Sequence, residues 1–315
     1  MVSFLIRRVL AMLPTLLIVM IVTFFLIHLI PGDPASVMLG PYATVDQIEQ
    51  LQHAMGLDQP ITVQFAKYVS DVFRGHLGQS ILFHMPVTKL MLQRAETSIM
   101  LALCSLIVVL VIGLPSGIIA AIKRNTWIDQ LFLSVALLGA SIPSFWLGLV
   151  LILAFAVRLH WLPSSGYPPI FATGNIANLR YLILPAITLG FSNSALLARL
   201  TRSSMLDVLQ EDYIDTARAK GLGENKVILK HALRNASIPI VTVLSFTFAG
   251  LLSGTVVTET VFALAGVGRL VVESVLGRDY PTIQGIMIVV AFIYLFINFI
   301  TDVIYAFLDP RVQYR

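Results

Sequence analysis

The chain has 315 residues, of which 57% are hydrophobic and only 12% are charged. Soluble domains usually carry about 25% charged residues. With a mean hydropathy of +0.87, the composition therefore excludes an ordinary soluble protein and indicates a membrane protein. The net charge of +4 comes from basic residues placed mostly at the ends of apolar segments. There they set topology, so we infer no nucleic-acid function from them.

Six stretches are long and apolar enough to cross a membrane, which takes about 20 residues of helix. Backbone groups in lipid must be hydrogen-bonded within their own segment, so the sequence predicts an all-α membrane protein with six transmembrane helices. The first stretch could be a signal peptide, but its apolar body is too long and no A-x-A-like cleavage site follows it. The expected spans are Val9–Ile30, Ser98–Ile122, Leu131–Val157, Tyr181–Ala198, Ile238–Phe262 and Ile283–Leu308.

The distribution of lysine and arginine predicts the orientation. Thirteen of them flank the segments assigned to one side, against four in the short loops assigned to the other. The positive-inside rule then places both termini in the cytoplasm. Residues 31–97 and the connections 158–180 and 263–282 are expected to face outward, and the polar loop near residue 215 is expected to face the cytoplasm.

Prolines and glycines within the spans predict local shape. Pro14, Pro115, Pro143 and Pro185 are expected to kink their helices. Two G-x-x-x-G motifs, Gly113…Gly117 and Gly250…Gly254, predict surfaces where a second helix approaches closely.

Charged groups at membrane depth are costly and often functional. Glu259, near the outer end of the fifth span, is one candidate for the translocation path. Ser192, Asn193 and Ser194, near the middle of the fourth, are others. The alternative is that these groups are interfacial or satisfied within the helix bundle.

No catalytic constellation is present in the sequence. The six histidines lack metal-site spacing, and neither a G-x-S-x-G elbow nor a G-x-x-x-x-G-K-[ST] phosphate loop occurs. The single cysteine, Cys104, excludes an internal disulfide and a cysteine metal cluster. We therefore expect no catalytic residues, no metal and no cofactor bound by this chain. Energy must come from an ion gradient or from another subunit.

The long polar stretch between Arg199 and Ile238 predicts two helices joined by a turn. Acids precede bases along the first helix, which favours the helix dipole, and Gly221 with Gly223 can end it. The second helix is expected over Glu224–Arg234. This pair could pack on its own membrane domain or dock a cytoplasmic partner. Its predicted apolar positions are Leu206, Leu209, Tyr213, Ile214, Ala217, Val227 and Ile228, with Lys226 and Lys230 flanking the last two.

Residues 212–235, "DYIDTARAKGLGENKVILKHALRN", resemble the EAA loop of ABC-importer permeases, which is E-A-A, three residues, Gly, nine residues and I-x-L-P. Asp215-Thr216-Ala217 stands for E-A-A, followed by Gly221. His231 and Arg234 replace Ile and Pro, as in the peptide/nickel branch. By this resemblance the ATPase-coupling residues are Asp212, Asp215, Thr216, Ala217, Arg218, Ala219, Lys220, Gly221, Leu222, His231, Leu233 and Arg234.

Other segments along the whole chain resemble the same branch. They are "IPGDPA" (30–35), "GLDQP" (56–60), "GHLGQS" (75–80), "TETVFALAGVG" (258–268), "RDYPTIQG" (278–285) and "LDPRVQYR" (308–315). His76 stands where an acid is common, and Ala265 where proline is usual.

The resemblance implies the first (B-type) permease subunit of a dipeptide/oligopeptide-type ABC importer in the bacterial inner membrane. Implied partners are a homologous second permease, two cytoplasmic ATP-binding subunits that hold ATP and Mg, and an extracytoplasmic solute-binding protein. The substrate would be a dipeptide, oligopeptide or glutathione, with nickel as an alternative. An ion-coupled secondary transporter is the competing function.

The implied organisation is that of a type I permease. It consists of an N-terminal transmembrane helix (1–30), an outward segment (31–94), a permease domain (95–305) with a coupling loop at 207–237, and a cytoplasmic tail (306–315).

Overall fold

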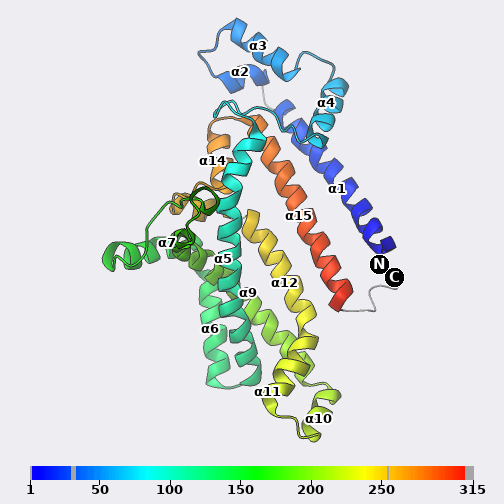
Figure 1. Cartoon of the computed structure of the whole chain (residues 1–315), viewed down its shortest axis with the longest axis vertical. Coiled ribbons are helices and arrows are strands. Elements are labelled where there is room, and N and C mark those ends of the chain that lie inside the picture. The colour runs from blue at the N-terminus through cyan, green and yellow to red at the C-terminus, as the bar shows by residue number, and fades with distance from the viewer. Residues whose placement is uncertain (1, 30–32, 254, 309–315) are drawn as a thin grey trace. The chain divides into compact units, whose positions relative to one another are not determined.

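The computed structural model describes residues 2–29, 33–253 and 255–308, and nearly all of these residues are helical or in short turns (Figure 1). Among them, the one β-type pairing is an isolated bridge between Gln79 and Pro86. The predicted all-α class is confirmed. The chain divides into two compact units, the described parts of 1–96 with 266–299 and of 97–265 with 300–315.

The first unit contains short helices whose ends follow local sequence signals. The Asp33 side chain accepts a hydrogen bond from the Ser36 amide and caps α2. Thr44 and Gln47 form a capping box at the start of α3. The helices of this unit are α1 (Val2–His28), α2 (Pro34–Leu39), α3 (Val45–Met55), α4 (Ile61–Phe73), α14 (Val267–Leu276) and the first parts of α5 (Val87–Ile122) and α15 (Tyr280–Leu308).

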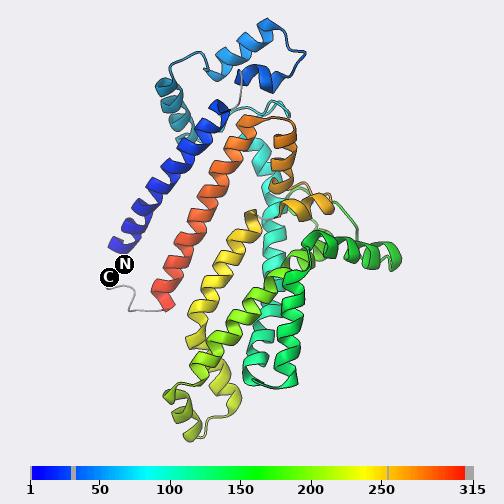
Figure 2. The same ribbon diagram turned by 180° about the vertical axis from the view of Figure 1, so that it is seen from behind.

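The second unit is organised around α9 (Ile183–Leu209), which contributes residues to both buried clusters of the unit. It lies against α6 (Trp127–Ser141) and α12 (Leu233–Ser253), as both ribbon views show (Figure 1, Figure 2). The remaining elements are α7 (Ser144–Leu151), η1 (Ile152–Arg158), α8 (Ile170–Thr173), η2 (Ile176–Leu182), α10 (Asp212–Ala219), α11 (Glu224–Lys226), η3 (Val227–Ala232) and α13 (Val256–Val261).

Five described helices are long and apolar enough to cross a membrane, and a sixth span exists if one bent pair is counted as a single crossing. That pair is the predicted third span. Its two halves, Trp127–Ser141 and Ser144–Arg158, meet at 99°. The expected kinked helix is wrong because the chain is fully broken there. Pro143 lacks an amide hydrogen and forces Ile142 into an extended conformation, with ψ of 123°.

The other prolines behave differently. The helices α1 and α5 continue through Pro14 and Pro115. Pro185 lies in the first turn of α9, where the missing amide hydrogen costs nothing. The predicted fifth span also ends earlier than expected, because α12 ends at Ser253 and α13 forms a separate helix.

The first G-x-x-x-G motif packs as predicted. A Cβ at Gly117 would lie 2.5 Å from the Ala198 carbonyl oxygen, and one at Gly113 would lie 2.9 Å from that of Ser194. Both contacts join α5 to α9. In the second motif, nothing lies within 4 Å of a Cβ at Gly250, and Gly254 falls outside the described residues.

Replacing Gly117 with alanine should lower stability. Alanine favours a helix interior by up to about 1 kcal/mol over glycine, but here its methyl group collides with α9, and overpacking costs about 1–3 kcal/mol. The midpoint of thermal unfolding of the purified chain measures the difference. Gly250→Ala is the matched control and should leave the midpoint unchanged or raise it. Equal midpoints for the two variants would contradict the close α5–α9 contact.

Candidate functional site

The predicted turn in the polar loop is present. Helix α10 carries Asp212 and Asp215 in its first turn and Arg218 in its last. The chain then turns at Gly221, whose φ of +77° is the left-handed conformation that glycine adopts without strain. The Gly221 amide donates to the Arg218 carbonyl oxygen at 2.9 Å, so the residue closes α10 as a C-terminal cap.

An arginine joins the two sides of this turn. The Arg218 guanidinium donates to both carboxylate oxygens of Glu224, at 2.9 and 3.3 Å, and to Asp215 at 3.2 Å. The hydrogen bond from Arg218 holds the pKa of Glu224 below its ordinary value of 4.5. A lowered carboxyl pKa means that the interaction is complete above pH 4.5 and is lost as the pH falls below it. The Glu224 carboxylate is therefore ionised at neutral pH and accepts from Arg218 across the turn.

Beneath the turn lies an apolar anchor. Ile214 and Ala217 of α10 pack with Val227, Ile228 and Ala232 in one buried cluster that also contains residues of α9. Lys226 and Lys230 remain exposed beside them, as predicted.

Tyr213, which was predicted to share this face, is instead 39% exposed. The prediction placed Leu206 to Ala217 on one uninterrupted helix, but the chain breaks between α9 and α10 at Gln210-Glu211. Leu206 and Leu209 on α9 are partly buried against the same cluster.

The second predicted helix, Glu224–Arg234, is not a separate element. The α11 helix passes through a π-helical stretch, η3, directly into α12, and together they form a continuous span, Glu224–Leu252. His231, Leu233 and Arg234 thus lie on the base of a long helix, while the other coupling candidates lie on α10 and its turn. Of those others, Ala217 is buried, and Asp212, Asp215, Thr216, Arg218, Ala219, Lys220, Gly221 and Leu222 are exposed.

The candidates for a translocation path lie on two helices, α9 and α13. On α9, Asn193 donates to the Leu189 carbonyl oxygen and Ser194 to that of Phe191. The hydroxyl of Ser192 is buried without a hydrogen-bond partner. Glu259 lies on α13, fully buried.

The carboxylate of Glu259 is held by hydroxyl groups. Ser98 and Thr255 both donate to its Oε1, at 2.6 and 2.8 Å. This arrangement favours the interpretation in which the bundle satisfies Glu259, and a role in the path stays a prediction.

One partly buried ion pair was missed by sequence reasoning. Arg202 of α9 donates from Nε and an Nη to the two carboxylate oxygens of Asp129 on α6, at 2.7 and 2.6 Å. The amide of Asn125, whose φ is +63°, also donates to Asp129 at 3.0 Å. The pair fixes α6 to α9 on the stretch of α9 that leads to α10.

A second missed group is Asp279, directly before α15. Its buried carboxylate accepts hydrogen bonds from the Ser80 hydroxyl, from the backbone of Ile81 and from the Thr282 hydroxyl. Asp279 therefore caps α15 and also ties the 80–82 loop to it. The motif D-Y-P-T carries a helix-start signal, with proline inside the first turn, that could have indicated the cap.

Removing one partner of the Asp129–Arg202 pair should be costly. Asp129→Asn leaves the guanidinium without a counter-charge, and for this partly buried pair the cost should be about 1–3 kcal/mol, between the values for exposed and for buried pairs. Thermal unfolding of Asp129→Asn, Arg202→Gln and the double variant forms a cycle that isolates the pairwise coupling. The double variant should lose less stability than the sum of the single losses. Strict additivity would contradict a direct interaction.

The fold and the loop at α10–α11 match one class of protein, the type I permease of an ABC importer. In a comparison with solved structures, the methionine ABC transporter MetNI in inward-facing crystal forms matches 70% of this chain and 96% of its own, with TM-scores of 0.58 and 0.59. At 18% identity, that likeness shows the fold alone.

The family is shown by sequence. Residues 113–314 match the family described as binding-protein-dependent transport system inner membrane component, and residues 1–102 match the N-terminal family of the same components. The chain belongs to this family of ABC-importer permeases, which work with a solute-binding protein and ATPase subunits.

Full-length relatives agree with that assignment. A protein of Brucella abortus named as a putative peptide transport system permease is 42% identical, over all of both chains. The glutathione transport system permease GsiC of Escherichia coli is also 42% identical over the full length of both.

Proposed function

We propose that the chain is the first of two homologous permeases in an importer of dipeptides, oligopeptides or a glutathione-like peptide. The observation that carries the proposal is full-length identity of 42% to permeases named for peptide and for glutathione transport. In this proposal both termini are cytoplasmic and the chain performs no catalysis and binds no cofactor. ATP and Mg are bound by two partner ATPase subunits.

The surface that contacts the ATPase is proposed to be α10, its turn and the base of α12. These residues are exposed on one side and anchored on the other by the buried cluster of Ile214, Ala217, Val227 and Ile228. Because the Arg218–Glu224 clasp spans the turn, a force applied to α10 is transmitted to α11 instead of opening the loop.

The two connections of this surface suggest how movement reaches the membrane. Its N-terminal end follows α9, and its C-terminal end continues into α12 without a break. A shift of α10 caused by closure of the ATPases would therefore act on two neighbouring spans at once. Packed helices change between discrete arrangements, and the different affinities of nucleotide states for those arrangements supply the bias.

Gly221 is the sharpest test of this coupling surface. Gly221→Val forces a branched side chain into a left-handed conformation, which costs roughly 1–2 kcal/mol, although the space around the residue is open. Uptake in proteoliposomes should fall by about tenfold or more, while ATP hydrolysis continues without coupling and the amount of inserted protein stays unchanged.

Two variants control for the substitution itself. Gly221→Asn should retain more transport, since asparagine tolerates this conformation. Gly223→Ser changes a neighbouring glycine whose φ is −61° and whose surroundings are equally open, so it should transport normally. Normal coupling in Gly221→Val would show that the turn is not part of the lever.

The substrate class is tested with the whole assembly reconstituted with its solute-binding protein. Labelled dipeptide, glutathione and Ni²⁺ are offered to proteoliposomes loaded with ATP. We expect ATP-dependent uptake of dipeptide or glutathione, and no uptake without ATP or without the binding protein. Uptake of Ni²⁺ alone would overturn the peptide assignment, and uptake driven by an ion gradient without ATPases would overturn the importer assignment.

A further inference from the structure

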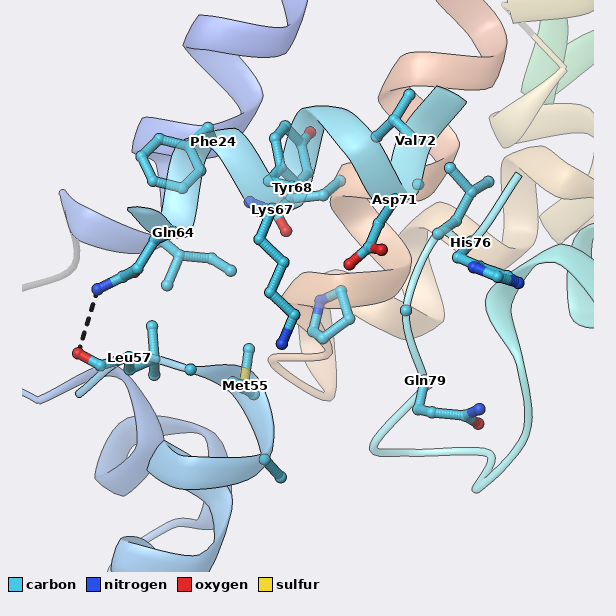
Figure 3. A pocket seen from close by; sticks show the side chains of 18 of the residues that line it. Phe24, Met55, Leu57, Gln64, Lys67, Tyr68, Asp71, Val72, His76 and Gln79 are labelled. Carbon is cyan, nitrogen blue, oxygen red and sulfur yellow. Dashed lines mark hydrogen bonds between the residues drawn. The ribbon is translucent and has the colours of Figure 1, made fainter. Parts of the chain in front are cut away.

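The first unit contains a cavity of about 400 Å³, within the 300–1,000 Å³ range of small-molecule sites. Its walls come from the end of α1, the α3–α4 pair, the 76–81 loop and the first turns of α15 (Figure 3). All of these segments belong to one compact unit. No residue of the coupling loop and none of the translocation-path candidates lines the cavity, and the proposed function does not use it.

Hydrogen bonds hold the walls of this cavity in place. Gln64 pairs with His28 at 3.1 Å and donates to the carbonyl oxygens of Leu57 and Gln59 at 3.2 and 2.7 Å. The hydroxyls of Tyr68 and Thr23 lie 2.8 Å apart. These polar groups are therefore engaged in shaping the cavity.

The cavity also has apolar lining, to which Phe24, Ile27, Leu57 and Ile288 contribute. The rings of Phe24 and Tyr68 lie 5.6 Å apart, centre to centre. The site thus offers both fixed polar groups and a surface for an apolar side chain.

Two opposite charges remain for a ligand. Lys67 and Asp71 are four residues apart on α4, so they share one face of the helix, and both line the cavity. Figure 3 shows both side chains extending from the same side of α4. In the part of the chain that the structure describes, no ion pair joins the two.

The position of the amine explains why the two charges stay apart. A Cβ at Gly56 would lie 3.8 Å from Lys67 Nζ, so the amine sits against the C-terminal end of α3. The negative end of the helix dipole favours a cation there. His76 and Gln79 line the other side of the cavity, beyond Asp71.

We propose that this cavity binds a small zwitterion with an apolar side chain, a free amino acid or a dipeptide. Lys67 would pair with the carboxylate, Asp71 with the ammonium group, and the apolar lining would cover the side chain. A wholly apolar ligand would leave both charges unpaired, and a simple anion would be repelled by Asp71. The site is additional to the transport path and does not depend on which solute is imported.

The test is a calorimetric titration of the nucleotide-free assembly of permeases and ATPases, without its solute-binding protein. The probe is L-alanyl-L-leucine, and its N-acetylated, amidated form is the uncharged comparison. We expect the dipeptide to bind at millimolar concentrations or tighter and the uncharged form not to bind. No binding of the dipeptide, or equal binding of both probes, overturns the proposal.

Variants assign the binding to this cavity. Lys67→Gln and Asp71→Asn should each weaken binding by about tenfold, the loss of one charged hydrogen-bonded contact. The exposed residues Lys89 and Asp46 lie outside the cavity, so Lys89→Gln and Asp46→Asn should bind as the wild type does. If Lys67→Gln and Asp71→Asn also bind like the wild type, the dipeptide is held elsewhere and the proposal fails.

Two further arms separate other outcomes. The titration is repeated in nanodiscs of phosphatidylglycerol with and without phosphatidylethanolamine, whose head group is also a zwitterion. Unchanged binding supports a soluble ligand, and loss of binding in the presence of phosphatidylethanolamine overturns it in favour of a lipid. Uptake by Lys67→Gln in the complete importer is measured in parallel, so that failure of peptide transport and failure of this site are seen independently.

Discussion

The packing of the second unit depends on how closely neighbouring helices can approach α9. Membrane helices gain little from the hydrophobic effect against each other, so they associate through tight packing and polar contacts. Here Gly113 and Gly117 remove side-chain bulk on α5, and Gly190 does so on α9, where a Cβ would lie 2.5 Å from the Cβ of Val108. The ion pair from Asp129 then fixes α6 to the same helix. The α9 helix thus holds α5 through close backbone packing and α6 through an ion pair.

This central position connects α9 to the proposed coupling surface. The helix extends past its predicted end at Ala198 to Leu209 and stops two residues before α10. Met205 and Leu197 of α9 lie in the same buried cluster as Ile214 and Val227. The turn that carries Gly221 therefore rests on the helix around which the unit is built. The turn is thus connected to the bundle through buried contacts as well as through the chain.

Features that depend on neighbouring residues could be predicted from the sequence. The left-handed turn at Gly221, the acid-to-base order along α10 and the anchoring by Val227 and Ile228 are all local, and the structure has them. Composition and length were enough to locate five of the spans, because lipid leaves the backbone few alternatives, but not to show that the third is broken. The family pattern then supplied the type of permease, which periodicity had left open.

Features that depend on distant partners could not be predicted. Arg202 was counted as a topology signal, but its partner Asp129 lies 73 residues earlier, and Asp279 binds Ser80 across 199 positions. A single sequence does not show which of several acids meets a given base or hydroxyl. Pro143 was recognised as a disturbance, yet whether a proline bends or breaks a helix depends on the packing around it. The two halves of that span pack differently, since α6 lies along α9 whereas α7 lies against both α9 and α13.

The π-helical stretch at Val227–Ala232 has a geometric consequence for the helix it feeds. A π-turn accommodates an additional residue in the helical ladder, and each residue advances an α-helix by about 100°. The side chains of α11 are therefore rotated about the helix axis. The reference is the position they would have if α11 and α12 formed one unbroken α-helix. The π-helical stretch therefore sets the rotation of side chains at the base of this helix relative to those in its long apolar part. The residues that pack at the base of the helix can therefore face a different direction from those that pack in its apolar part, although both lie on one continuous helix.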